Sequence, residues 1–477
     1  MNRLRLSLWF LLALLLAACG DTPSSADLSQ SRLQTQSTTP ATEAKPLPEL
    51  IVYIHGYNAK GVDKHQVYGA LRSESLTDAI ARFGSFTPLQ SLDQHDFRYG
   101  VAMTTYYGDT PPAYYSDADI AQIDAVTQRY GGGIPRYALI VAKFIRHTLT
   151  ATGAAHVMLI SGSMGSLVTR WMIEKNLENL AAEGRIAKWL SINGVIRGNY
   201  LSSQSDLAKF VNAVQPQPID VKHMSYRWIE TNLHDPKSVA DAPFYKRIQI
   251  GEISSTRSGK PFGALLKDKP NDGYQVVRDT YFKEVSPQAR YHDLPPTHSY
   301  FHRGHIGIKE ARGAWLAIYN FLTSKKRVRI TLEAVTVDNL HEKRMPLQHK
   351  TRSEIVFASS VVSPEALKSF GISDPVCRRT LTGGTLPVHH YTKAGETRLL
   401  SQTIYDDFVL PSERSLDITL EGYELDDAIK YGIHELLLGG NERLGSVTMT
   451  LPLQNGTYPF EAEEYRGTIK VEIIDYL

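Results

Sequence analysis

Short apolar runs recur along the first two thirds of the chain, separated by polar or glycine-containing segments. Runs of strand length occur at residues 47–58, 101–107, 156–161 and 244–255. Apolar positions repeat instead at helical spacing over residues 167–172 and 310–322. Strands that alternate with helices predict an α/β domain.

The pattern changes after a polar, basic segment at residues 323–327. Beyond it, apolar and polar residues alternate as they do in half-buried strands. This alternation occurs at residues 328–337, 354–362, 415–420, 446–451 and 467–474. Strands with turn clusters and little helix predict an antiparallel sandwich. We therefore expect an α/β domain over residues 49–324 and an all-β sandwich over residues 325–477.

Ser163 lies where the apolar run 156–161 gives way to the helical pattern. A sharp strand-to-helix turn needs small neighbours, because the helix folds back over the strand. Ser161, Gly162 and Gly165 meet that need. The usual form of such a turn is G-x-S-x-G, so Ser161 in place of the first glycine is a small departure. The pattern predicts that Ser163 is a nucleophile presented at the corner.

The residues His55, Gly56 and Tyr57 follow the first apolar run and resemble the HG-x loop of bacterial α/β-hydrolase lipases and esterases. In that family the loop presents a backbone N–H to the developing oxyanion. The resemblance gives this role to Tyr57, together with the N–H of Met164 after the nucleophile. Two main-chain donors would be preorganised for the negative charge.

The acid of a catalytic triad has two candidates. Residues 189–200 loosely resemble the sixth strand and following loop of the same lipases, and Asn271, Asp272 and Gly273 resemble the turn that carries the triad acid. Asp followed by Gly is also an ordinary turn signal. Asp272 is the favoured acid, and Glu252, at the end of the preceding strand candidate, is the alternative.

The base of the triad should precede the last helix of the domain, at residues 310–322. Three histidines do so: His298, His302 and His305. His305 directly precedes the helix in the sequence R-G-H-I-G, so it is favoured. Ser163, Asp272 and His305 then follow the chain order of an α/β-hydrolase triad. His305 would accept and return the serine proton, and Asp272 would fix the tautomer of the imidazole.

The resemblance to α/β-hydrolase lipases covers residues 47–322. It implies an α/β-hydrolase fold, with a mostly parallel sheet and helices on both faces, and carboxylic ester hydrolysis through an acyl-serine. Phospholipases and thioesterases use the same triad, and a non-catalytic lipid-binding lipoprotein with this fold is the alternative from another class. In this family the position of residues 199–242 often holds a lid. Residues 108–135 contain several tyrosines and three consecutive glycines, and we expect an aromatic loop there.

The N-terminus has the features of a secretory signal: Arg3 and Arg5, an apolar run at residues 6–16, then small residues. The ending L-A-A-C resembles the bacterial lipoprotein box, which implies removal of residues 1–18 and lipidation of Cys19. Gly20, in place of aspartate, implies by the same resemblance an anchor in the outer membrane, on its periplasmic side or at the cell surface. The polar residues 19–48 predict an unfolded tether.

The composition narrows the kinds of function and binding site that the chain could have. The 477 residues include 52 basic and 50 acidic side chains, a formal net charge of +2, which gives no electrostatic support for nucleic-acid binding. With Cys19 lipidated, Cys377 has no partner for an intramolecular disulfide. The sequence predicts neither a cofactor nor a metal site. His389 and His390 are adjacent, so on a strand they would point to opposite faces.

The strand succession of the C-terminal domain resembles that of C2-like lipid-docking domains. Calcium-binding members of that family place several aspartates in facing loops. The only residues of this chain near matching positions are Asp338, Glu424, Asp426 and Asp427. These are too few to predict a calcium site. The expected partners are an ester or lipid substrate and a membrane reached through the lipid anchor.

Overall fold

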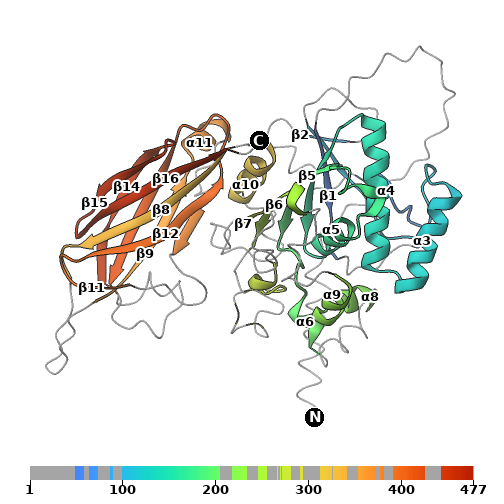
Figure 1. The fold of residues 1–477 in the computed structure, drawn as a ribbon, viewed down its shortest axis with the longest axis horizontal. Coiled ribbons are helices and arrows are strands. Elements are labelled where there is room, and N and C mark those ends of the chain that lie inside the picture. Colours follow the sequence, from blue (N-terminus) through green and yellow to red (C-terminus); the bar gives the residue numbers. More distant parts are fainter. Residues whose placement is uncertain are drawn as a thin grey trace, which may run out of the picture. The chain divides into compact units, whose positions relative to one another are not determined.

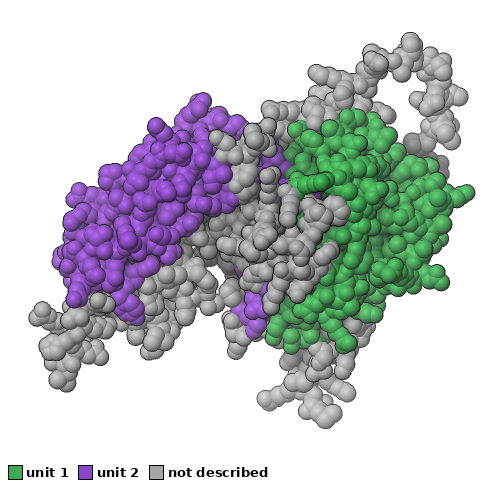
Figure 2. Space-filling model, viewed as in Figure 1, with its two compact units in different colours: residues 1–187, 198–235, 242–247 green, residues 188–197, 236–241, 248–477 purple. Residues whose placement is uncertain are grey.

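The computed structural model describes residues 49–57, 64–72, 86–89, 99–204, 218–233, 245–254, 266, 269, 271–280, 291–293, 312–324, 326–340, 353–370, 377–380, 390–424 and 442–475. The chain divides into two compact units (Figure 2). The first comprises residues 1–187, 198–235 and 242–247, and the second comprises residues 188–197, 236–241 and 248–477.

Four parallel strands form the centre of the first unit (Figure 1). Strand β1 (Glu49–Ile54) pairs with β3 (Tyr99–Met103) on one side and with β4 (Val157–Gly162) on the other, and β3 also pairs with β2 (Phe86–Pro88). Every residue of β4 is buried, as expected for a parallel strand covered on both faces. The carboxyl end of β4 leads directly into the turn at Ser163.

Three helices accompany these strands: α3 (Asp117–Tyr130), α4 (Ile134–Thr152) and α5 (Met164–Glu174). Helix α5 is buried along its whole length. The expected aromatic loop over residues 108–135 is wrong for half of that range, which α3 occupies. A capping box starts α3, in which the Ser116 hydroxyl accepts from the backbone N–H of Asp119 and the Asp119 carboxylate accepts from that of Ser116.

The segment after the fifth strand contributes short helices to the first unit. They are α6 (Tyr200–Ser203), α8 (Pro218–His223) and α9 (Tyr226–Asn232). Trp228 of α9 stacks on Trp171 of α5 with ring centroids 5.3 Å apart, and on His223 of α8 at 4.1 Å. These aromatic contacts attach the helices to the buried α5.

The second unit contains three more parallel strands: β5 (Ile186–Ile192), whose first residues belong to the first unit, β6 (Gln249–Ile253) and β7 (Tyr291–Asp293). Helix α10 (Arg312–Thr323) packs on them, since a Cβ at Gly251 would lie 2.7 Å from the Phe321 ring. The Lys188 ammonium donates to the carbonyls of Phe321 and Leu322. A cation thus satisfies the C-terminal carbonyls of the helix.

The second unit also contains antiparallel strands, which form two sheets. One sheet has the order β10-β9-β13-β14, with β11 also on β9, and the other has the order β12-β8-β16-β15 (Figure 1). The strand bounds are β8 (Lys326–Val337), β9 (Ser353–Val362), β10 (Cys377–Thr380), β11 (His390–Thr392), β12 (Thr397–Phe408), β13 (Ser415–Glu424), β14 (Glu442–Pro452), β15 (Gly456–Glu461) and β16 (Tyr465–Asp475). Helix α11 (Pro364–Phe370) follows β9.

Tyr465 connects the two antiparallel sheets. Its ring is fully buried and lies 5.3 Å from that of Phe357 in β9, and its hydroxyl donates to the carbonyl of Leu420 in β13 at 2.8 Å. Gly422 leaves the space for this ring, because a Cβ there would lie 2.9 Å from it. The sheets therefore pack face to face as a sandwich.

The fold class predicted from the sequence is confirmed. Parallel strands and helices of the α/β-hydrolase type precede an all-β sandwich. None of the helices within the described ranges is long and apolar enough to cross a membrane.

Candidate active site

The backbone at Ser163 has the conformation of a strained turn. Its φ is 52° and its ψ is −125°, values that residues with a side chain rarely adopt. It stands between β4 and α5, in the N-cap position of the helix, yet its hydroxyl makes no capping hydrogen bond. This is the strand-turn-helix geometry that presents the nucleophile of an α/β-hydrolase.

Two glycines allow the turn to approach the end of β1. A Cβ at Gly165 would lie 2.4 Å from the carbonyl oxygens of both Ile54 and His55, which is far inside van der Waals contact. A Cβ at Gly56 would lie 3.1 Å from the Cβ of Ser163. The HG-x loop and the turn at Ser163 are therefore in direct contact.

Ser161 replaces the first glycine of the usual motif without exposing a polar group. It is fully buried, and its hydroxyl shares a 3.0 Å hydrogen bond with that of Ser166 on α5. Buried hydroxyls without a partner are costly, so this pair makes the serine tolerable inside the turn.

A tyrosine that the sequence did not single out holds the HG-x loop. The Tyr106 hydroxyl donates to the carbonyl oxygens of His55 at 2.6 Å and Gly56 at 3.0 Å, and its ring stacks on the His55 ring at 3.9 Å. The Nδ1 of His55 lies 2.8 Å from the Gly56 oxygen. A carbonyl only accepts, so Nδ1 carries the proton and donates.

The structure thus brings together Ser163 and the two residues expected to provide the oxyanion donors. Tyr57 ends the described part of the HG-x loop, and Met164, fully buried, is the first residue of α5. The use of their N–H groups as an oxyanion hole stays a prediction.

Both candidate acids are buried in the second unit. Asp272 is 2% exposed, and its Oδ1 accepts from the backbone N–H groups of Tyr274 at 2.9 Å and Gln275 at 2.7 Å. Glu252, 1% exposed, lies in β6. Gly273 has a φ of 96°, which shows why glycine follows the aspartate in this tight turn.

The remaining predicted site residues lie outside the described residues. They are His298, His302, His305 and Cys19. Ser163 and Asp272 belong to different compact units. The assembly of the triad is therefore still a prediction.

A buried carboxyl near the HG-x loop was not predicted. Asp220 of α8 is fully buried, and its Oδ2 accepts from the Tyr107 hydroxyl at 3.4 Å. Burial raises the pKa of Asp220 to about 7, and the neighbouring hydroxyls of Tyr137 and Tyr107 oppose that rise. Tyr107 in turn lies 5.5 Å from the His55 ring. Only the folded chain reveals this acid, because its tyrosine partners come from elements about a hundred residues away.

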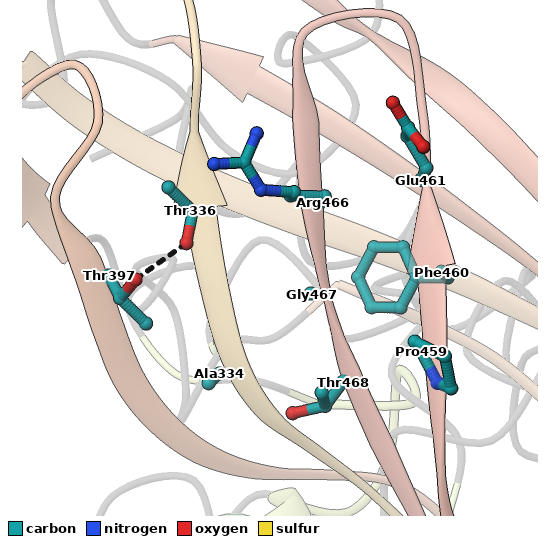
Figure 3. A pocket seen from close by; sticks show the side chains of 9 residues that line it. All are labelled: Ala334, Thr336, Thr397, Pro459, Phe460, Glu461, Arg466, Gly467 and Thr468. Carbon is teal, nitrogen blue, oxygen red and sulfur yellow. Dashed lines mark hydrogen bonds between the residues drawn. The ribbon is translucent and has the colours of Figure 1, made fainter.

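A hollow of about 470 Å³ lies on the sandwich, over strands β8, β12, β15 and β16 (Figure 3). Its lining residues are Ala334, Thr336, Thr397, Pro459, Phe460, Glu461, Arg466, Gly467 and Thr468. The hydroxyls of Thr336 and Thr397 hydrogen-bond to each other at 2.7 Å. This lining includes no histidine or cysteine.

No protein-family model and no curated protein matches the chain. Among solved structures it resembles Bacillus licheniformis lipase BlEst2 in mature form, with 15% identity, a TM-score of 0.35, and coverage of 58% of this chain and 90% of that one. It also resembles phospholipase PlaB from Legionella pneumophila, with 10% identity, a TM-score of 0.35, and coverage of 80% and 86%. At such TM-scores these likenesses carry no argument.

The raised pKa of Asp220 predicts that the stability of the folded protein depends on pH. Between its ordinary pKa near 3.8 and the raised value of about 7, the folded chain keeps a proton that the unfolded chain has lost. The contribution of Asp220 to the free energy of unfolding therefore falls as pH rises through this window, by roughly 1 kcal/mol per pH unit, and is constant above it. Asp220→Asn should remove this slope.

Urea unfolding at pH 5 and pH 8 measures the effect. Relative to wild type, Asp220→Asn should gain stability between the two pH values. Asp109→Asn is the control, because it removes an acidic side chain of the same unit that is 67% exposed. Parallel pH profiles for wild type and Asp220→Asn would contradict the assignment.

Proposed function

We propose that the protein is a serine hydrolase of carboxylic esters, a lipase or esterase. One observation carries the proposal: Ser163 has a strained positive φ between a buried parallel strand and a buried helix, in contact with the HG-x loop. Strain of this kind persists where function requires it. The turn presents the Ser163 hydroxyl, which makes no capping hydrogen bond to α5.

The reaction would proceed in two acyl transfers. The Ser163 oxygen attacks the ester carbonyl carbon while His305 accepts the serine proton, and the carbonyl oxygen becomes an oxyanion facing the N–H groups of Tyr57 and Met164. Collapse expels the alcohol, which takes the proton from His305. Water, deprotonated by His305, then releases the acid and restores Ser163. Asp272 would hold the imidazole and stabilise its cation.

The structure of α5 supports the attack electrostatically. The oxyanion would form at the N-terminus of this helix, where unpaired N–H groups and the helix dipole favour negative charge. The buried surroundings strengthen that attraction, because α5 is covered along its length.

The finer assignment concerns lipid. A lipid anchor at Cys19 would hold the enzyme near membranes, and the sandwich, which resembles C2-like domains, would dock on lipid surfaces. Phospholipase and thioesterase activities fit the same serine. A non-catalytic lipid-binding lipoprotein is the second candidate, and loss of reactivity at Ser163 would favour it.

The first test labels the nucleophile. A fluorophosphonate should modify the wild-type protein covalently, and Ser163→Ala should abolish labelling and lower turnover of short esters by on the order of 10⁴ to 10⁶. Thr150→Ala is the control, because it removes an exposed hydroxyl of the same unit, on α4. Turnover by Ser163→Ala near the wild-type rate would refute the proposal.

A second test separates the candidate bases and acids. His305→Ala should abolish labelling, whereas His298→Ala and His302→Ala should retain most of it. Asp272→Asn should lower kcat by on the order of 10⁴, because the imidazole then adopts the wrong tautomer. A severe loss in Glu252→Gln with activity kept in Asp272→Asn would move the acid to β6.

The third test concerns location. If Cys19 is lipidated, the mature protein should partition into detergent with the outer-membrane fraction, and Cys19→Ser should be released or left unprocessed. The reason is that two or more acyl chains anchor a protein stably. Cys377→Ser serves as the control for loss of a thiol. Recovery of the wild type entirely in the soluble fraction would contradict the anchor.

A further inference from the structure

Two donors converge on one carbonyl of the HG-x loop. The Gly56 oxygen accepts from His55 Nδ1 at 2.8 Å and from the Tyr106 hydroxyl at 3.0 Å, and that hydroxyl shares its single proton with the His55 oxygen at 2.6 Å. Tyr106 is itself fully buried and its ring is held against His55, with 9° between the ring planes. The hydroxyl therefore has a fixed position relative to the loop.

The geometry of the peptide bond transmits this constraint. The C=O of Gly56 and the N–H of Tyr57 belong to one planar trans peptide, so they point in opposite directions. Rotation of that peptide would turn the Tyr57 N–H away and replace it with a carbonyl dipole of the wrong sign. A held Gly56 oxygen thus means a held Tyr57 N–H.

We propose that Tyr106 is a positioning residue, whose hydroxyl fixes the peptide between Gly56 and Tyr57 so that the Tyr57 N–H faces the oxyanion. This rests on the proposed hydrolase function. Tyr106 does not touch substrate. It acts through the loop. Because the peptide is already held in place, it does not have to rotate when the negative charge develops.

The state of the hydroxyl is suited to this task. Burial raises the pKa of Tyr106 well above its usual value of 10, and the nearby Asp220 carboxyl adds to the rise. The hydroxyl therefore stays protonated, and remains a hydrogen-bond donor, throughout the pH range in which a hydrolase works. Because the hydroxyl is uncharged, Tyr106 adds no charge of its own near the oxyanion, which the main-chain N–H groups stabilise.

The first measurement reads the peptide directly and needs no catalysis. A sample with ¹³C at glycine carbonyls and ¹⁵N at tyrosine amides gives one carbonyl–amide signal for each Gly–Tyr peptide. The chain has three such peptides, which end at Tyr57, Tyr274 and Tyr423. Tyr106→Phe should displace the Tyr57 signal and leave the other two in place, which also shows that both of those regions remain folded.

The second measurement is kinetic. Tyr106→Phe should lower kcat on a short soluble ester by about tenfold or more with little change in KM, since loss of a whole oxyanion donor costs roughly 10² to 10³. Tyr114→Phe is the matched control, because its hydroxyl donates to another glycine carbonyl of the same unit, that of Gly69, at 2.7 Å. It should keep kcat.

The outcomes separate the two proposals. An unmoved Tyr57 signal, or equal kcat in Tyr106→Phe and Tyr114→Phe, would overturn the role of Tyr106. Absent labelling of wild-type Ser163 would overturn the hydrolase function, while the carbonyl signal would still decide whether Tyr106 holds the peptide. If Tyr106→Phe does not fold, 3-fluorotyrosine at this position, a stronger donor of nearly the same shape, should displace the same signal alone.

Discussion

The close approach of helix α5 to the end of strand β1 is the contact on which the rest of the candidate site depends. At Gly165 the helix backbone lies so near the carbonyls of Ile54 and His55 that no side chain fits between them. This contact sets the height of the turn above the sheet and hence the position of Ser163. It also places the HG-x loop beside Ser163, because the loop is the direct continuation of β1.

Much of the fold could be predicted because its signals are local. The apolar run of β4, the helical spacing of α5 and the alternation of β8, β9 and β13 are properties of neighbouring residues. The expectation failed for α3, a helix with a single fully buried residue, Ile123, and so with almost no apolar stripe to detect. Its signal was the capping box at Ser116, which lies within a polar stretch.

The site was predictable only in part for a related reason. The candidate nucleophile Ser163 is marked by the small residues that its own turn requires. Tyr106 and Asp220 carry no such mark, since their roles come from residues about fifty and about a hundred positions away in the sequence, respectively. A strand pattern that ends near Tyr106 indicates burial but not which carbonyl its hydroxyl reaches. Buried polar networks of this kind follow from tertiary contacts.

Ser163 occupies the N-cap of α5 without capping it. Serine is among the best N-cap residues, and a hydroxyl that bonds to the first turn typically contributes about 1 kcal/mol. The positive φ forgoes that gain and adds the strain of a side chain in a region suited to glycine. Selection for stability alone would thus replace this serine with glycine. Stabilised variants of the protein should accordingly be sought away from this turn. A better start to α5 at position 163 would remove the Ser163 hydroxyl that the strained turn presents.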